Sequence, residues 1–182
     1  MIIAEVGSRQ GLDSIDRHMA SVFNGNSSAR KRRWTMRRVD FMVGKHDFKT
    51  LTAEQFMQDD VYFYHPEDTG EQLAQVMTAG GFGSVPVVDR DRKVIGIVSE
   101  FDLLKAIMED RALSQVTAGA LMTPNPITVS PNTPAMDIVR LLEEKHLIRV
   151  PVVDNEGKLL GIVARRDILE GYLRATTPVK GF

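Results

Sequence analysis

Apolar and polar positions follow the same order in two parts of the chain. Short apolar runs at residues 85–88 and 150–153 are each followed by a turn that contains aspartate, which is typical of buried strands. A second apolar run comes after each turn, at residues 94–98 and 159–163. The pattern therefore predicts two β-hairpins of the same design.

A helix is predicted before each hairpin. Thr133 is placed to cap the second of these helices, with Pro134 at its first position. Thr69 takes the corresponding capping position in the first. Gly80 to Gly83 follow that helix and are interpreted as its C-cap and a tight turn, not as a phosphate-binding loop. The apolar helix positions are Leu73, Val76, Met77, Ile138, Leu141 and Leu142.

Each block is completed by two further elements. A second helix follows each hairpin, over residues 101–108 and 166–173, and a short extended segment opens each block, at residues 62–64 and 127–129. The order is therefore β-α-β-β-α in both blocks. One block is too small to close a core, whereas two can stack about a pseudo-twofold axis and bury their sheets. We predict an α/β fold on this basis.

The two blocks are copies at a constant offset of 65 residues. The segment SVPVVDRDRKVIGIVSEFDLL, residues 84–104, returns as RVPVVDNEGKLLGIVARRDIL, residues 149–169. A proline, a glycine and an aspartate are kept at the same places, together with the apolar positions. A repeat of this kind predicts one supersecondary unit used twice.

Charge divides the chain near residue 50. Ten Lys or Arg and five Asp or Glu fall in residues 1–50, whereas 13 Lys or Arg and 19 Asp or Glu fall in the remainder. We predict an N-terminal extension over residues 1–50, one repeat over 51–112, a second over 113–176 and a tail over 177–182. The net charge of −1 excludes a uniformly basic nucleic-acid binder.

Composition removes several classes of function. The chain has no cysteine, which excludes disulfides, thiolate metal sites and a cysteine nucleophile. No apolar run is long enough to span a bilayer, so we expect a cytoplasmic protein without a membrane partner. The four histidines show no metal-ligand spacing, and no nucleophile–base arrangement is recognisable. We therefore expect neither a metal site nor an enzyme.

The extension combines a short amphipathic helix with a basic run. Ile15, Met19 and Val22 recur at helical spacing. The basic residues can neutralise phosphates while Trp34 stacks on a base, which would suit nucleic acid. Alternatively, Trp34 and residues 41–43 pack against the repeats or a partner, and the cations are solvated. The run consists of Arg30, Lys31, Arg32, Arg33, Arg37 and Arg38.

The doubled elements PVVD, GIV and S/T-x-x-D resemble the CBS (cystathionine-β-synthase) domain, and two in tandem resemble a Bateman module. The resemblance covers residues 51–174. It implies a non-catalytic regulatory sensor that needs no cofactor. Such a sensor binds AMP, ADP, ATP or S-adenosylmethionine between the repeats and signals to a separate protein. It also implies a homodimer formed through the helices after the hairpins, with candidate contacts Leu103, Leu104, Ile107, Ile168, Leu169 and Leu173.

Asp102 and Asp167 fall near the starts of these helices. A carboxylate accepts two hydrogen bonds, which suits ribose hydroxyls, and a helix N-terminus suits a phosphate. The simpler interpretation is that each aspartate only caps its helix. Two further alternatives are a nucleic-acid-associated protein that uses the pair for dimerisation and the basic run for binding, and a structural subunit with an empty cleft.

The resemblance implies two composite sites, each combining one aspartate with the first strand and pre-proline residues of the other repeat. Site A is favoured because it has more of the expected groups, among them Arg149, which stands where family members often carry a phosphate-binding arginine. In site B, Arg165 and Arg166 supply positive charge, and Tyr62 either stacks on adenine or fills the cleft. Site A comprises Ser99, Asp102, Ile127, Thr128, Arg149 and Pro151. Site B comprises Tyr62, Ser84, Pro86, Arg165, Arg166 and Asp167.

Overall fold

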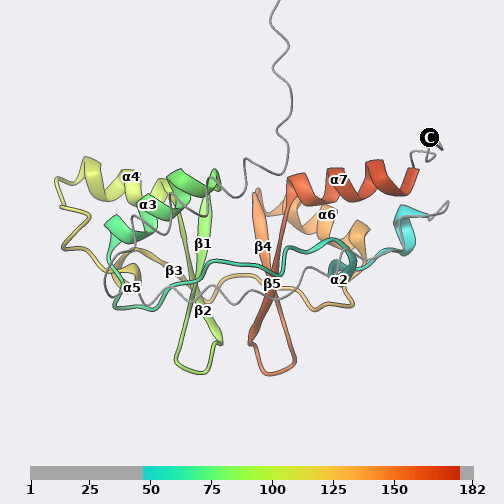
Figure 1. The fold of residues 1–182 in the computed structure, drawn as a ribbon, viewed down its shortest axis with the longest axis horizontal. Helices are drawn as coiled ribbons and strands as arrows, with labels where there is room; N and C mark the ends of the chain where they lie inside the picture. The colour runs from blue at the N-terminus through green and yellow to red at the C-terminus, as the bar shows by residue number, and fades with distance from the viewer. Residues whose placement is uncertain (1–46, 177–182) are drawn as a thin grey trace, which may run out of the picture.

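The computed structural model describes residues 47–176. Two β-hairpins stand next to each other at the centre of the molecule, with the helices of each repeat on their outer sides (Figure 1). The predicted N-terminal helix, the basic run at residues 30–38 and the tail lie outside the described residues. Within the described part of the chain, no helix is long and apolar enough to cross a membrane.

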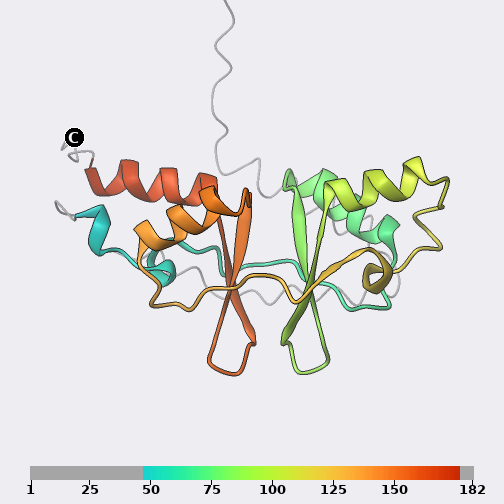
Figure 2. The same ribbon diagram turned by 180° about the vertical axis from the view of Figure 1, so that it is seen from behind.

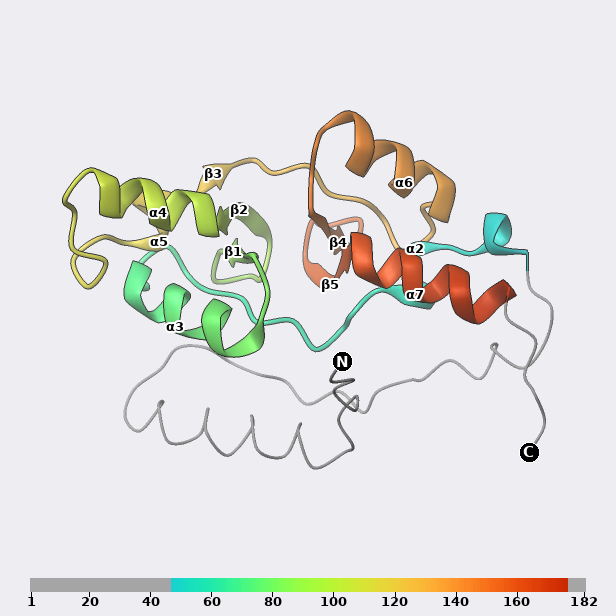
Figure 3. The same cartoon turned by 90° about the horizontal axis from the view of Figure 1, so that it is seen from above.

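The predicted α/β fold with two repeats of the same design is confirmed. Figure 3 shows α3 beside α4 in one half and α6 beside α7 in the other. The first half contains α3 (Gly70–Gly80), β1 (Ser84–Val88), β2 (Val94–Ser99) and α4 (Glu100–Met108). The second contains α6 (Ala135–Glu144), β4 (Arg149–Val153), β5 (Leu159–Ala164) and α7 (Arg165–Thr176). The short elements are η2 (Phe48–Thr50), α2 (Ala53–Phe56), α5 (Ala118–Leu121) and β3 (Thr123–Pro124).

The two hairpins share one register. Pro86 pairs with Ile97 in the first and Pro151 with Ile162 in the second, and both ladders shift near the end of the first strand. The predicted extended segments at 62–64 and 127–129 are shorter than expected. Each forms a single parallel bridge, Tyr64 to Val87 and Val129 to Val152.

The helix before each hairpin begins in its own way. Thr69 caps α3 through a capping box, as predicted, and Gly81 ends that helix with a φ of 64°. The predicted cap of α6 is wrong. Pro134, not Thr133, is its N-cap, and the Thr133 hydroxyl instead accepts a hydrogen bond from the Ser130 N–H at 3.0 Å. Thr133 is thus used in the preceding turn.

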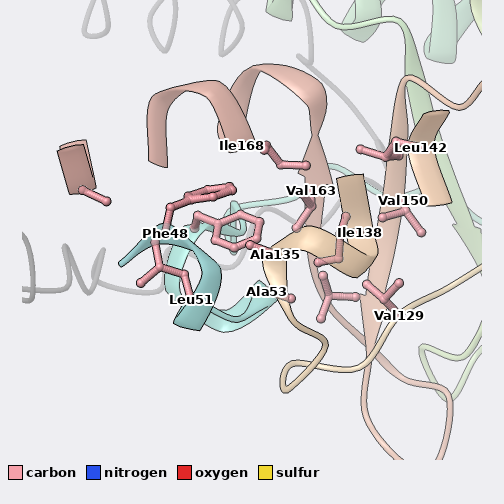
Figure 4. Close-up of a cluster of buried hydrophobic side chains, with 13 residues drawn as sticks. Phe48, Leu51, Ala53, Val129, Ala135, Ile138, Leu142, Val150, Val163 and Ile168 are labelled. Atoms are coloured by element: carbon pink, nitrogen blue, oxygen red, sulfur yellow. The ribbon is translucent and has the colours of Figure 1, made fainter. Parts of the chain in front are cut away.

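Each hydrophobic core takes a short helix from the other half of the sequence. Phe48 and η2, together with α2, pack into the core formed by α6, α7, β4 and β5 (Figure 4). In the same way, α5 packs against α3, α4, β1 and β2. The chain therefore crosses between the halves twice, once over residues 57–64 and once over residues 122–129 (Figures 1 and 2).

Matched backbone hydrogen bonds fix both exchanged helices. The Ala53 N–H donates to the Thr133 carbonyl at 2.9 Å, and its counterpart 65 residues later, the Ala118 N–H, donates to Asp68 at 2.7 Å. In return, the Ala135 N–H donates to the Leu51 carbonyl at 2.8 Å, and the Gly70 N–H donates to Val116 at the same distance. The exchange is therefore reciprocal and follows the pseudo-twofold axis.

The hairpins also join each other directly, next to their turns. The Val94 N–H donates to the Gly157 carbonyl, and the Leu159 N–H donates to the Arg92 carbonyl, both at 3.0 Å. Phe63 packs with Leu159 in a small cluster between the halves. The Arg92 guanidinium lies 4.9 Å from the Phe63 ring centre. These contacts join the two sheets at the ends that carry their turns.

Replacing Gly161 by alanine tests how closely the exchanged segment packs. A Cβ there would lie 2.7 Å from Met57 Sδ and 2.9 Å from the Gln58 carbonyl oxygen. We expect Gly161→Ala to lower the free energy of unfolding by roughly 1–3 kcal/mol, measured by urea denaturation. Gly171→Ala is the control, because a Cβ there meets Phe56 at an ordinary 3.5 Å within a helix. An unchanged urea midpoint for Gly161→Ala would contradict this packing.

Candidate functional site

Asp102 lies in the first turn of α4, where it forms a capping box with Ser99. Its Oδ2 atom accepts hydrogen bonds from the Ser99 N–H at 2.7 Å and from the Ser99 hydroxyl at 2.6 Å. The Asp102 N–H donates to the same hydroxyl at 3.3 Å. Capping is therefore one role of Asp102, and it uses a single carboxylate oxygen. The other oxygen, Oδ1, takes no part in these bonds.

Asp167 holds the corresponding place in α7 but is buried, with 9% of its surface exposed. Its Oδ2 accepts from the Ala164 N–H at 2.7 Å, and its Oδ1 accepts from Gln58 Nε2 at 3.1 Å. Gln58 belongs to the segment that crosses from α2 towards Tyr62, and its backbone pairs with Ile162. Asp167 thus links the start of α7 to the crossing chain.

Arg149 is the first residue of β4 and pairs in register with Ala164. Its Nη1 donates to the Ser84 carbonyl at 3.2 Å, and its guanidinium lies 5.6 Å from the centre of the Phe82 ring. Burial lowers the pKa of Arg149, and the charges of Asp167 and then Glu100 oppose that shift. Its buried Nε has no hydrogen-bond partner within residues 47–176.

Tyr62 does not present an open ring face on both sides. It stacks on Phe82 with ring centres 5.9 Å apart and planes 23° apart. Tyr62 and Arg149 therefore both contact Phe82, and these contacts join the crossing segment to the second half. The sequence left two roles for Tyr62, stacking on an adenine or filling the cleft. On the side that faces Phe82, the Tyr62 ring packs against the protein itself.

The contacts of Arg149 place it beside residues of both predicted sites. Its guanidinium meets the Ser84 carbonyl and the Phe82 ring on which Tyr62 stacks. The charge of Asp167 acts on it, and so does that of Glu100, which lies between Ser99 and Asp102 in the sequence. The assignment of Arg149 to site A therefore stays a prediction.

The remaining site A residues fall into two groups. Ser99 and Asp102 bond to each other, whereas Pro151 is buried and its carbonyl accepts a hydrogen bond from Val129 at 3.0 Å. Ile127 is 41% exposed, and Thr128 is half-buried. Within the part of the chain that the structure describes, no hydrogen bond joins the two groups.

The remaining site B residues lie at the starts of strands and helices. Ser84 and Pro86 are buried in β1, where the Pro86 carbonyl accepts from the Tyr64 N–H at 3.0 Å. Arg165 is exposed, and its Nε donates to the Leu147 carbonyl at 2.8 Å. Arg166 is also exposed. Both arginines thus stand at the solvent side of the α7 start.

Sequence reasoning missed Gln58 and Phe82, which connect the site. Gln58 follows Met57, the first methionine of the repeat, but its counterpart is Thr123, so the repeat gave no sign of an amide there. Phe82 lies among glycines and is matched by Leu147, which marks the position only as apolar. Their partners become visible only when the crossing segment is in place.

Two of the predicted dimer contacts are wrong. Leu103 and Ile168 face the cores, with 5% and 7% of their surface exposed. The other four are exposed on α4 and α7, beside an exposed Phe101 and Tyr172. Among the described residues, no group of three or more His, Asp or Glu side chains is arranged to hold a metal ion.

The CBS domain family matches the chain twice, at residues 53–109 and 118–174. A protein of Methanopyrus kandleri is 34% identical over 131 residues, covering 70% of this chain and 67% of that protein. CBSX1, a chloroplastic CBS domain-containing protein of Arabidopsis thaliana, is 28% identical, covering 68% of this chain and 64% of CBSX1. The homoserine O-acetyltransferase of Methanosalsum zhilinae is 27% identical over 71% of this chain, which spans only 25% of that enzyme.

Solved structures share the fold. CBSX2 of Arabidopsis thaliana, solved in complex with AMP, is 28% identical with a TM-score of 0.62, covering 70% of this chain and 99% of that one. The CBS domain pair of MJ0100, solved with 5′-methylthioadenosine and S-adenosyl-L-methionine, is 23% identical with a TM-score of 0.61. It covers 68% of this chain and 96% of that one. At that identity the second likeness shows the fold alone.

The capping bonds predict unequal effects on stability. Asp102→Ala removes a half-buried cap and should cost about 1 kcal/mol of unfolding free energy. Asp167→Ala removes a buried carboxylate and leaves the Ala164 N–H and the Gln58 amide without their acceptor, so we expect about 2–3 kcal/mol. Asp137→Ala, whose exposed carboxylate bonds only to Arg140, is the control. Equal losses for Asp102→Ala and Asp167→Ala in thermal denaturation would show that the Gln58 link adds nothing.

Proposed function

This chain belongs to the CBS domain family, and from that premise we propose that it is a regulatory protein that binds an adenosine-containing ligand between its two repeats. The single observation that carries the proposal is the arrangement at the junction of the halves, where Arg149 and Tyr62 both contact Phe82 and the charge of Asp167 acts on Arg149. CBSX2, a relative with the same fold, is a protein solved with AMP. AMP, ADP, ATP and S-adenosylmethionine are the ligands we propose for this chain.

Each part of such a ligand finds a suitable group. The aspartate at a helix start can accept hydrogen bonds from ribose hydroxyls, because each carboxylate oxygen accepts more than one. Arg149 supplies a charged donor whose Nε is not otherwise used, and a guanidinium fork matches the oxygens of a phosphate. Tyr62 or the wall around Pro86 supports the base in site B, and Ile127 with Thr128 does so in site A.

The proposed mechanism follows from where these groups originate. In site B, Asp167 and Arg165 belong to the second half, while Tyr62 and Ser84 belong to the first. A ligand that touches both halves favours the relative angle that fits it best and shifts the population of the pair. That change of angle would be transmitted to a separate partner protein.

The proposed role is non-catalytic, as the resemblance to the CBS domain implies and as the lack of a recognisable nucleophile–base arrangement in the sequence predicts. The matched acetyltransferase shares only a quarter of its length with this chain, so the match extends over a CBS region of an enzyme. The regulated partner and the cytoplasmic location remain predictions from the sequence.

Thermal denaturation with and without ligand tests the proposal. AMP, ADP, ATP and S-adenosylmethionine are each added to the full chain, and a ligand at 100 times its dissociation constant adds about 2.7 kcal/mol of stability. That gain corresponds to a rise of roughly 5–10 °C in the melting temperature. A rise with none of the four ligands would refute the proposal.

Asp167→Asn and Asp102→Asn then locate the site. Asparagine keeps an acceptor for the cap but removes the charge that holds the ribose hydroxyls. We expect the ligand-induced rise to disappear in the variant of the occupied site and to persist in the other. A rise that both variants retain would mean that neither aspartate contacts the ligand.

We further propose a homodimer formed through the exposed apolar side chains of α4 and α7. Leu104 and Ile107 are 53% and 54% exposed, and Leu169 and Leu173 are 65% and 60% exposed. Exposed apolar side chains gathered on a helix are typical of an interface between subunits.

The double variant Leu104→Glu/Leu169→Glu should halve the mass of the particle in light scattering. Leu160→Glu is the control, because Leu160 is also partly exposed, at 39%, but lies on β5 and not on either helix. A monomeric wild-type chain at micromolar concentration would refute the dimer.

A further inference from the structure

The outer surfaces of α4 and α7 carry opposite charges at matching positions of the repeat. Three pairs of solvent-accessible residues, each 65 positions apart, reverse their charge, namely Glu100 with Arg165, Lys105 with Glu170, and Glu109 with Arg174. Asp102 and Asp167 keep the same sign, but they cap their helices and are half-buried and buried. The reversal therefore belongs to the outer surface and not to the caps.

Between these charges both helices expose large apolar side chains. Leu104 on α4 and Leu169 on α7 occupy matching positions, and both are exposed. Phe101 is 80% exposed, and its counterpart on α7 is the exposed Arg166. A guanidinium over the face of an aromatic ring is a favourable contact. Each helix thus presents apolar surface bordered by charges, and the charges of one helix complement those of the other.

Both helices lie along the edge of the molecule opposite the hairpin turns, and both begin next to the central strands (Figure 1). From there α4 runs outward to one side and α7 to the other. A second copy can cover this edge through a twofold axis in two orientations. A horizontal axis in Figure 1 places α4 against α4 and α7 against α7. An axis perpendicular to the picture places α4 against α7 of the second copy.

Charge distinguishes the two orientations. In both of them helix starts meet helix starts, so each residue faces the same position of the repeat in the second copy. If like helices pair, Glu100 faces another Glu100 and Lys105 another Lys105. If α4 pairs with α7, Glu100 faces the partner's Arg165, and Lys105 faces the partner's Glu170. Like charges across an interface are unfavourable, whereas complementary charges fix its orientation.

We propose that the homodimer pairs α4 of one chain with α7 of the other. The exposed apolar surface of α4 is covered by α7 of a second copy, and the same contact occurs twice about one twofold axis. Phe101 then meets the partner's Arg166. This inference rests on the homodimer proposed above, and it specifies which helices face each other.

A charge swap within α4 tests this orientation. Lys105 Nζ and Glu109 Oε1 lie 4.0 Å apart as an exposed ion pair, and Glu170 with Arg174 is the matching ion pair of α7. Lys105→Glu/Glu109→Lys keeps the net charge but gives α4 the same order of charges as α7. At low ionic strength the dissociation constant of the dimer should rise roughly 10- to 100-fold, because ion pairs between subunits become like-charge pairs. Sedimentation equilibrium of the full chain measures this constant.

The compensating swap in α7 is the matched control. Glu170→Lys/Arg174→Glu alone should weaken the dimer by a similar factor, whereas the two swaps together should restore the wild-type dissociation constant to within about threefold. A variant that had merely lost stability would not be rescued by a second pair of substitutions. The four exchanged residues belong to neither proposed ligand site, so the test does not depend on ligand binding.

Pairing of like helices predicts different results. There each swapped helix faces its own copy, so like charges meet before and after the swap and the dissociation constant does not change. An unchanged dimer after either swap, or no recovery when the swaps are combined, would overturn this inference and leave the homodimer standing. A monomeric wild-type chain would overturn both.

Disulfide trapping gives a second measurement, because the chain contains no cysteine of its own. Oxidation of Leu104→Cys/Leu169→Cys should give covalent dimers whose linked peptides join position 104 to position 169, as identified by mass spectrometry. The single variant Leu104→Cys should give no covalent dimer. Peptides that join position 104 to position 104 would show that like helices pair and would overturn the inference.

Discussion

The reciprocal exchange of short helices is the constraint on which the rest of the molecule depends. Neither half has a complete core of its own, because α2 packs into the second half and α5 into the first. The paired bonds from Ala53 and Ala118 fix both insertions in the same way. Separating the halves would expose both cores, so the pair must fold as one unit even though its sequence consists of two copies.

The exchange also positions the proposed ligand sites. Because the chain passes between the halves twice, each crossing segment runs beside the start of a helix from the opposite repeat. Gln58 is an example, because its side-chain amide donates a hydrogen bond to Asp167, which lies more than a hundred residues later in the sequence. A ligand at such a junction contacts elements of both halves at once. This is the arrangement in which binding energy can be converted into a change of relative angle.

The departures from symmetry carry the specific information. The cores and hairpins of the two halves are nearly interchangeable, whereas Arg149 and Glu100 have counterparts of different charge. Arg149 has both a structural role and a proposed role in ligand binding. Its contacts with Ser84 and Phe82 brace the two halves, and its unused Nε remains available to a ligand. A ligand that engages Arg149 would therefore act on the brace itself.

The sequence by itself determined the repeat, the two hairpins, their flanking helices and the capping aspartates. These features depend on interactions within a few residues or on a period of 65 that is visible in the printed chain. It also marked Arg149 as the candidate phosphate ligand, from its place before Pro151.

Only the tertiary structure decided which half each short helix belongs to and that the Arg149 guanidinium reaches the Ser84 carbonyl of the other half. A four-residue helix has no periodicity that identifies its partner, and a local pattern does not encode the direction of a long side chain. The same limit explains why Leu103, which the sequence predicts at a subunit interface, lies in the core. Contacts between residues far apart in the sequence settled each of these points.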